Sequence, residues 1–230
     1  MTRIAKFLFF AIVVSSCSGQ ENLREYYYSI GDKEQIQIYQ YVDKFDTENI
    51  EYWKVTGSPT TKTILTESFN SDFELYNIFE EHLDDKGAAV FRYADFQIKK
   101  NESSIRINGT VIDSMVFKWL DSEKYQYSIN YLDPAFGEMN FLKKRTLDEF
   151  VDFTLFETEY ETAKFKDEYE MIQLNANEVY KFYQFTYYAR NIGMVKYERF
   201  YPDGRKVQLE LKQILTNDEF EKLKLNVSNN

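Results

Sequence analysis

The sequence predicts a mainly β protein, built as one antiparallel curled sheet or open barrel with a short C-terminal helix. Aromatic residues make up 18% of the 230 residues, with 20 Phe and 19 Tyr, and flat side chains suit a pleated, half-buried surface. Only 3 Pro and 8 Gly interrupt the chain. Several segments alternate apolar and polar residues, which is the period of a strand with one buried face. One domain is the default expectation for this length.

The N-terminal segment is predicted to be a secretory signal peptide over residues 1–16. Arg3 and Lys6 form a basic lead before the apolar run 7–14, and small residues follow at 15 and 16. The apolar run is too short to span a bilayer, so the segment is typical of an export signal.

Cys17 is the predicted site of lipidation. The run Val14-Ser15-Ser16-Cys17 resembles the bacterial lipobox, which implies a diacylglyceryl thioether on Cys17 and an acylated new amino terminus. Two or more acyl chains give a stable membrane anchor, whereas a single acyl chain anchors a protein only marginally. Cys17 is the single cysteine, so no intramolecular disulfide can form. The alternative is an ordinary signal peptide whose small residues include a cysteine.

Export and a lipid anchor determine the expected location and organisation. We expect a polar lipidated tether over residues 17–25 and a single antiparallel β domain over 26–230. Residues 18–22 contain one acid, Glu21, whereas surface-export signals in related bacteria carry several. The periplasmic face of the outer membrane is therefore favoured over the cell surface.

The clearest strand patterns lie at residues 125–131 and 206–212. Asn108-Gly109 suits a type I′ turn, which predicts a hairpin of 103–107 with 110–118. Pro202-Asp203-Gly204 predicts a second hairpin, of 195–201 with 206–214. Less regular patterns predict further strands at 35–42, 51–56, 62–66, 73–81, 88–98, 149–156 and 178–189. The segment 69–84 also fits a helical face.

The C-terminal helix is predicted from a capping box. Thr216 and Glu219 have the spacing of reciprocal N-cap bonds, and Leu215 can pack against Phe220, which predicts a helix over 217–224. The chain has no internal repeat or Pro/Gly/Ser-rich linker. A turn cluster at 133–137 leaves a two-lobed arrangement as the alternative.

A motif near the C-terminus carries a family resemblance. The stretch Tyr187-Tyr188-Ala189-Arg190-Asn191-Ile192-Gly193-Met194-Val195-Lys196-Tyr197-Glu198 resembles the tail of uncharacterised secreted and lipid-anchored proteins of Bacteroidota. Asn191 stands where glycine is usual, and asparagine tolerates the same left-handed backbone. The resemblance implies the last hairpins of an open sheet like that of lipocalins and envelope lipoprotein carriers. It implies no activity, and turn or pairing roles are favoured for these residues.

The residues that carry catalytic chemistry are sparse. A net charge of −10 argues against a nucleic-acid partner. His82 is the single histidine and lies among acids, so neither a His-rich metal site nor a catalytic triad is expected, and no cofactor is predicted. Glu157, Glu159 and Glu161 could flank a glycosidic bond, but such a run is more typical of a solvated face. We therefore expect no enzyme, and a hydrolase is only the third candidate.

Two functions from different classes remain. The first is a noncatalytic envelope lipoprotein that holds an apolar ligand or lipidated partner in the concave face of the sheet. The second is a tethered interaction subunit of an envelope assembly with no small-molecule ligand. Residues 26–28 and the aromatic segment 180–188 could line such a pocket, although core packing explains most of them. Asp113-Ser114-Met115 resembles a bacterial O-glycan sequon, with Ser114 as acceptor.

Overall fold

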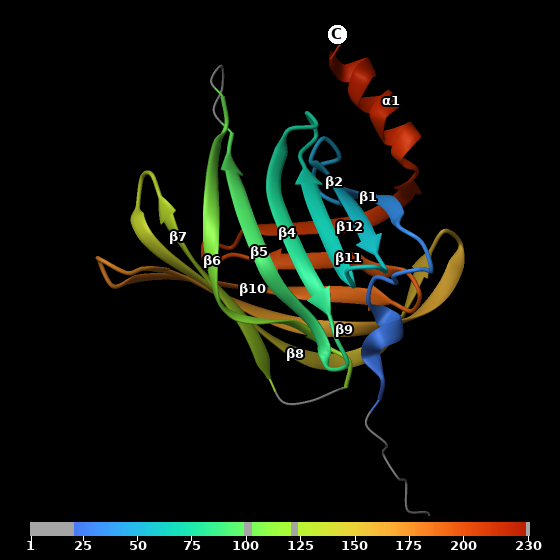
Figure 1. Cartoon of the computed structure of the whole chain (residues 1–230), viewed down its shortest axis with the longest axis horizontal. Coiled ribbons are helices and arrows are strands. Elements are labelled where there is room, and N and C mark those ends of the chain that lie inside the picture. Colours follow the sequence, from blue (N-terminus) through green and yellow to red (C-terminus); the bar gives the residue numbers. More distant parts are fainter. Residues whose placement is uncertain (1–20, 99–102, 121–123, 229–230) are drawn as a thin grey trace, which may run out of the picture.

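Twelve strands form a closed antiparallel barrel in the computed structural model, which describes residues 21–98, 103–120 and 124–228. Each strand pairs with the next along the chain, and β12 returns to pair with β1 (Figure 1). A short 3₁₀ helix, η1 (Leu23–Tyr26), precedes the barrel, and α1 (Asn217–Ser228) follows it. The prediction of a mainly β fold with a C-terminal helix is confirmed.

The strands have the following bounds: β1 Gln35–Asp43, β2 Ile50–Ser58, β3 Thr63–Phe69, β4 Leu75–Leu83, β5 Gly87–Gln97, β6 Ile105–Lys118, β7 Tyr125–Asp133, β8 Gly137–Leu155, β9 Thr158–Gln173, β10 Glu178–Ala189, β11 Gly193–Phe200 and β12 Lys206–Leu215. The segment 69–84, which also fits a helical face, contains strand β4, and the strand predicted at 73–81 overlaps most of it. The cluster at 133–137 is the tight turn between β7 and β8.

The barrel is closed, whereas the sequence predicted a curled sheet or an open barrel. Antiparallel pairs between β1 and β12 run from Ile38 with Leu215 to Asp43 with Leu209. Alternation within a segment shows which side chains share a face, but it carries no information about two strands at opposite ends of the chain. Closure removes both sheet edges, which would otherwise present unpaired backbone groups.

The predicted hairpin turn at Asn108-Gly109 is also wrong, because both residues lie inside the continuous strand β6. Asn108 pairs with Ala94 and Gly109 with Tyr93 on β5. A Cβ on Gly109 would lie 2.3 Å from Ile129 and 2.8 Å from Tyr93. The glycine therefore permits close packing inside the barrel, which is the other use of glycine in a strand.

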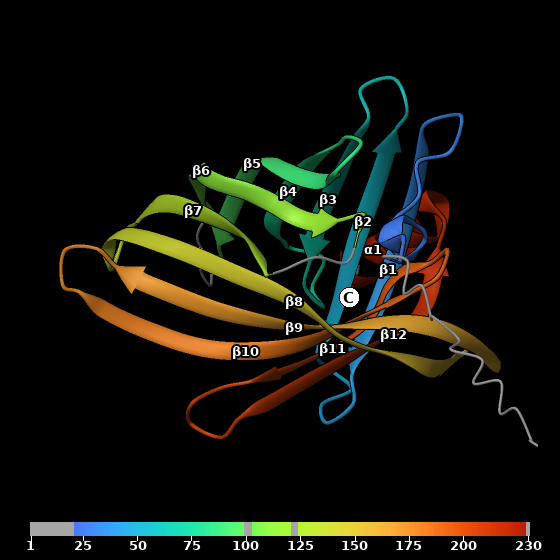
Figure 2. The ribbon, with the colours of Figure 1, turned by 90° about the horizontal axis from the view of Figure 1, so that it is seen from below.

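Strands β8 and β9 are much longer than the sequence indicated. The prediction included only 149–156 of β8 and no strand over 158–173, whereas the two strands pair from Met139 with Gln173 to Leu155 with Thr158. Figure 2 shows β8, β9 and β10 as long curved ribbons that extend past their neighbours. Near the turn between β8 and β9, the ring of Phe150 contacts the ring of Tyr26, with centroids 5.7 Å apart.

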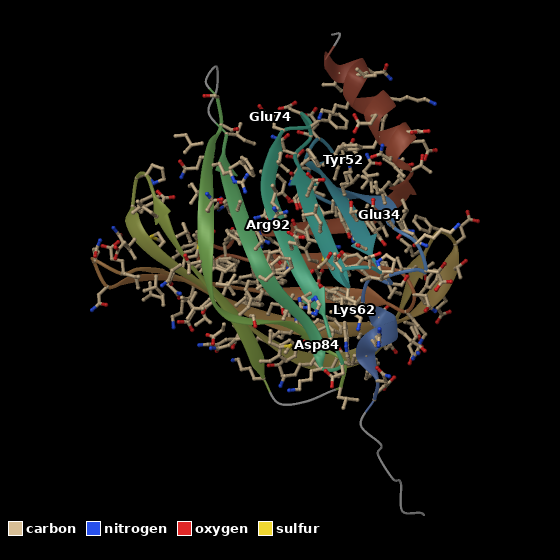
Figure 3. The ribbon with its side chains drawn as sticks, viewed as in Figure 1. Glu34, Tyr52, Lys62, Glu74, Asp84 and Arg92 are labelled. Atoms are coloured by element: carbon tan, nitrogen blue, oxygen red, sulfur yellow. The ribbon has the colours of Figure 1, made fainter. Side chains whose placement is uncertain are left out.

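The N-terminal segment docks on one end of the barrel, which we call the η1 end. Leu23 is buried and its N–H donates to the Trp119 carbonyl at 2.6 Å. Residues 22–25, which belong to the expected tether 17–25, contact the barrel through the Asn22–Leu120 bridge and η1. Figure 3 shows Lys62 and Asp84 at this end, with Tyr52 and Glu74 at the opposite end near α1.

Helix α1 packs on the outer face of the barrel. The capping box is confirmed, since the Thr216 N–H donates to the Glu219 carboxylate at 2.8 Å and the Glu219 N–H donates to the Thr216 hydroxyl at 3.3 Å. Phe220 is buried against Tyr52 and Phe69, in the same cluster as Leu215. Within the described ranges, no helix has the length and apolar character needed to cross a membrane.

Candidate functional site

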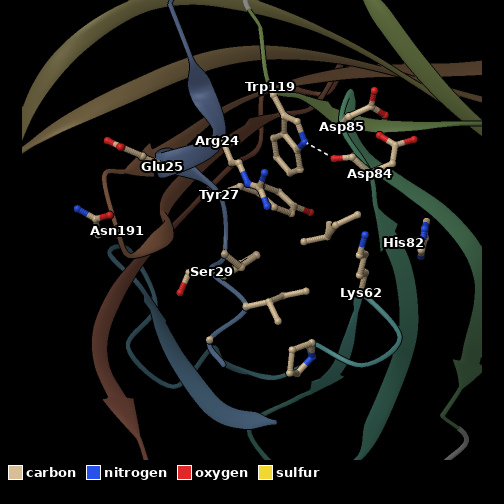
Figure 4. Close-up of a pocket in the computed structure, with 15 residues that line it drawn as sticks. Arg24, Glu25, Tyr27, Ser29, Lys62, His82, Asp84, Asp85, Trp119 and Asn191 are labelled. Atoms are coloured by element: carbon tan, nitrogen blue, oxygen red, sulfur yellow. Dashed lines mark hydrogen bonds between the residues drawn. The ribbon is translucent and has the colours of Figure 1, made fainter. Parts of the chain in front are cut away.

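Two hollows in the described part of the molecule are candidate sites, and we call them the central cavity and the end pocket. The central cavity has a volume of about 280 Å³ and is lined from every strand except β1 and β12. The end pocket, of about 710 Å³, lies at the η1 end between the N-terminal segment and the loops beside it (Figure 4). Tyr27 lines both hollows, so its side chain lies between them.

Asp167 on β9 is the centre of a buried ionic network beside the central cavity. Its carboxylate accepts the Arg145 Nε at 2.6 Å, the Arg145 Nη2 at 2.8 Å and the Lys143 Nζ at 2.9 Å. The Thr186 hydroxyl donates to the same carboxylate at 2.6 Å. Because a carboxylate has roughly four lone-pair positions, these contacts fill its capacity.

The charged groups in this network shift one another's pKa values. Burial alone would raise the pKa of Asp167, but the neighbouring Arg145 and Lys143 outweigh it and lower that pKa to about 2. Burial and the Arg145 charge lower the pKa of Lys143 to about 8, against the opposing effect of Asp167. The β8 side of the cavity therefore holds more positive charge than its single carboxylate neutralises.

Arg199 on β11 adds a third cation to the same wall. Its Nε donates to Gln184 Oε1 at 2.9 Å, and the Gln184 amide in turn donates to the Thr186 hydroxyl at 2.9 Å. The guanidinium lies 5.1 Å from the ring centroid of Tyr197 and 5.5 Å from that of Phe182. Aromatic faces and one amide thus fix the orientation of Arg199 without a carboxylate.

The opposite wall carries the acids Glu51 on β2 and Glu81 on β4. Glu51 accepts the Trp53 Nε1–H at 3.0 Å and the Tyr197 hydroxyl at 2.9 Å. Glu81 accepts the Tyr27 hydroxyl at 2.5 Å. Burial raises the pKa of Glu81 to about 7, although the Tyr27 bond and the cations across the cavity oppose the shift.

The lining does not fit the expected apolar ligand. Polar and charged side chains line the cavity alongside aromatic rings, and a buried polar group is costly unless it is hydrogen-bonded. These polar lining residues are Glu51, Thr66, Ser68, Asn77, Glu81, Lys143, Arg145, Gln184, Thr186 and Arg199. Such a lining favours a ligand that carries its own polar groups.

In the end pocket, Trp119 and Asp84 are held by hydrogen bonds within the surrounding loops. The Trp119 indole N–H donates to the Asp84 carbonyl at 2.7 Å, the bond drawn in Figure 4. The N–H groups of Lys86 and Gly87 donate to the Asp84 carboxylate, and the Lys86 bond is the main cause of its lowered pKa. Asp84 therefore closes a turn, and its donors are backbone groups of its own loop.

The predicted site residues are dispersed. Cys17 lies outside the described residues. Ser114 is exposed on β6, as a glycan acceptor would need to be. His82 is exposed on β4 at the edge of the end pocket. In the ranges that the structure describes, no group of three or more His, Cys, Asp or Glu side chains is placed to hold a metal ion.

The structure also shows where the acidic run 157–161 and the tyrosines 26–28 lie. Glu157 lies in the turn before β9 with a φ of 63°, while Glu159 and Glu161 are exposed. Tyr26, Tyr27 and Tyr28 are buried at the η1 end. The prediction of core packing for these tyrosines is confirmed.

The C-terminal motif forms the platform on which the N-terminal segment docks. The Asn191 N–H donates to the Glu25 carbonyl at 2.6 Å, and the Tyr188 ring stacks on Tyr27 at 5.8 Å. Arg190 donates to the Tyr26 hydroxyl and pairs with acids of the N-terminal segment and of β9. These contacts support the structural role that was expected for the motif.

Lys196 and Glu198 share one face of β11 and are only slightly exposed. Their side chains are each 15% exposed and the Lys196 Nζ lies 3.4 Å from the Glu198 carboxylate. The Tyr187 hydroxyl also donates to Glu198 at 2.9 Å, and the Tyr187 ring faces Lys196. The pair thus belongs to a half-buried cluster on the outer face of the barrel.

The cavity cations were not identified from the sequence. Lys143, Arg145 and Asp167 occupy inward positions of strands that the alternation of apolar residues did not show. The available signal was the charged residues 143 and 145, which continue the two-residue spacing of the apolar inward residues 139 and 141. The strand that follows is rich in aromatic residues. Such spacing is also common on solvated strands, so it did not distinguish the two cases.

Comparison with known proteins identifies the fold. No protein-family model matches the chain, and no curated protein sequence matches it. A candidate exported protein with a YmcC-like fold from Bacteroides fragilis NCTC 9343 is similar over 83% of this chain and 99% of its own, at 11% identity and a TM-score of 0.50.

Two further structures are similar over much of their length. A candidate lipoprotein from Parabacteroides distasonis ATCC 8503 has 12% identity over 83% of this chain and 98% of its own, with a TM-score of 0.49. The hypothetical lipoprotein YmcC from Escherichia coli K12 has 7% identity over 82% and 90%, with a TM-score of 0.39. The Bacteroides fragilis match establishes a YmcC-like fold for this chain, and the ligand must be argued from the site itself.

Proposed function

We propose that this protein is an exported, lipid-anchored envelope protein that binds a small polar molecule inside its barrel. Support for export and anchoring comes from the signal-like residues 1–16 and from Cys17 in a lipobox-like sequence. The similar Bacteroides fragilis protein is also described as exported. We place the anchor on the periplasmic face of the outer membrane, because few acids follow Cys17.

The observation that carries the binding function is the central cavity. Its volume of about 280 Å³ is close to the lower end of small-molecule pockets, about 300 Å³. Aromatic faces supply contact area, and a few polar groups converge on the same space, as in known ligand sites. This proposal replaces an apolar ligand with a polar one.

We propose no catalytic role for the cavity. Asp167 is fully occupied by its four contacts, and Glu51 holds an indole N–H and a tyrosine hydroxyl. A general base must reach the proton that it abstracts, and these carboxylates are engaged by neighbouring side chains. The arrangement supports binding and orientation of a ligand.

Native mass spectrometry of the protein purified from its own host tests this function. We expect the wild-type protein to carry a low-mass species that is released on denaturation. The species should be present in the Lys166→Met variant and absent from the Lys166→Met, Arg199→Met double variant. Lys166 lies on the outer face of β9 and provides the matched control. Co-purification of a polypeptide without a low-mass species would instead favour a tethered interaction subunit, and would overturn the proposal.

A further inference from the structure

Arg199 has hydrogen-bonding capacity that the described residues do not use. A guanidinium has five N–H groups, of which the Nε donates to Gln184 and one Nη1 hydrogen reaches the Tyr201 hydroxyl at 3.4 Å. The other N–H groups have no partner among residues 21–98, 103–120 and 124–228. Arg199 lines the central cavity, so this capacity is available to a ligand there.

Lys143 adds a second incompletely used cation on the same aromatic ring. Its Nζ lies 5.3 Å from the Tyr169 ring centroid, and the Arg199 guanidinium carbon lies 5.9 Å from the same centroid. An ammonium has three donors, and among the described residues Lys143 has one acceptor, Asp167, at 2.9 Å. Both cations therefore lie near the Tyr169 ring, and the Arg199 charge contributes to the lowered pKa of Lys143.

The carboxylates nearby do not neutralise this pair. Asp167 is saturated by Arg145, Lys143 and Thr186. Glu51 on β2 accepts the Tyr197 hydroxyl and Glu81 on β4 accepts the Tyr27 hydroxyl, and neither forms an ion pair with Arg199 or Lys143 among the described residues. The wall carries three cations, Lys143, Arg145 and Arg199, against the single carboxylate of Asp167. A ligand that brings one negative charge to Tyr169 would lower this excess of positive charge from two to one.

The shape of the wall distinguishes between anions. Around Arg199 the surfaces are mostly ring faces, of Tyr169, Phe182 and Tyr197. The Gln184 amide beside them already donates to the Thr186 hydroxyl. A planar carboxylate needs donors along one edge and matches the guanidinium fork. A tetrahedral phosphate presents oxygens in all directions and would leave some of them against aromatic carbon.

We propose that the central cavity binds the carboxylate of a compact organic acid, held by Arg199 and Lys143, with the body of the acid against the aromatic walls. This inference rests on the proposed function, since it names the ligand class of the same cavity. Arg145 orients Asp167 and is a positioning residue in this arrangement.

Calorimetric titration with acetate, benzoate and cyclohexanecarboxylate tests the inference. Their neutral amides and inorganic phosphate serve as comparison probes. We expect at least one of the carboxylates to bind, with its amide and phosphate each about 10- to 100-fold weaker, the range for loss of hydrogen bonds to a charged group. Arg199→Met should lower carboxylate affinity by a similar factor, and Lys166→Met, on the outer face, should leave it unchanged.

The outcomes separate the two proposals. If amides bind as tightly as acids and Arg199→Met has no effect, the carboxylate inference is wrong while the binding function stands. If phosphate binds more tightly than every carboxylate, the ligand class is a phosphate and the inference is also wrong. If no probe binds and the host-purified protein carries no low-mass species, both proposals fail. Should Arg199→Met not fold, the ¹⁵Nε resonance of Arg199 in the wild-type protein replaces it, and an unchanged resonance on titration with carboxylate would overturn the inference.

Discussion

Asp167 joins two cations and a hydroxyl through one buried carboxylate, so its removal should be costly. Asp167→Asn would leave Arg145 and Lys143 buried without an anion, and breaking a buried pair in this way costs about 3–5 kcal/mol. The neighbouring Glu168 lies on the outer face and pairs with exposed lysines. Glu168→Gln should therefore cost less than about 1 kcal/mol. Urea unfolding measures both, and equal losses would contradict the assigned network.

Glu81 should make the folded state less stable as the pH rises. Its pKa is about 7 in the folded state and about 4.3 when unfolded, so the folded protein binds more protons between these values. Stability from this group is complete below the unfolded pKa and is lost as the pH rises through 7.

Glu81→Gln should remove this pH dependence. Free energies of unfolding at pH 5 and pH 7.5 should differ less in the variant than in the wild type. Glu80→Gln is the control, since Glu80 lies on the same strand and pairs with Arg92 at the surface. The account would be contradicted if the free energy of unfolding of the wild type rose from pH 5 to pH 7.5 and that of Glu81→Gln rose by the same amount. Glu81 would then not be buried as described.

At the scale of elements, two glycines in turns test how the N-terminal segment docks. Gly193, the first residue of β11, and Gly204, between β11 and β12, have φ values of +98° and +85°. A Cβ on Gly193 would lie 2.5 Å from the Tyr28 ring, whereas Gly204 has open space. Both alanine variants should lose about 1–2 kcal/mol to backbone strain, and Gly193→Ala should lose about 1–3 kcal/mol more to overpacking. Equal melting temperatures would contradict the contact with Tyr28.

The elements also show what the sequence could and could not predict. Strand β7 was predicted because Tyr127 and Ile129 keep the inward positions apolar. Strand β9 was missed because Asp167 occupies an inward position between Phe165 and Tyr169, and a buried charge interrupts the apolar alternation on which the prediction depends. The central cavity was missed for the same reason, since its polar residues are those that weaken the strand pattern.

At the scale of the whole molecule, the fold class followed from local alternation, whereas closure of the barrel did not. Pairing of β1 with β12 joins residues such as Ile38 and Leu215, and no local pattern encodes that partnership. Docking of the N-terminal segment depends on the same kind of distant contact, between Glu25 and Asn191. Both features required the structure.

Attachment of the whole protein to a membrane is predicted to depend on Cys17. Cys17→Ser removes the thiol that forms the thioether, so the variant should remain an uncleaved or soluble precursor. Incorporation of labelled palmitate in the native host checks this, with Ser18→Ala as the matched control. Unchanged labelling and membrane attachment in Cys17→Ser would contradict the lipid anchor.

The central claim is that the barrel is a binding site for a small polar molecule. A crystal structure of the protein purified from its own host, without added organic acids, tests it most directly. Our account predicts electron density for a compact molecule in the central cavity, with its polar end on Arg199 and Lys143. A cavity that contains only ordered water in the host-purified protein would contradict it.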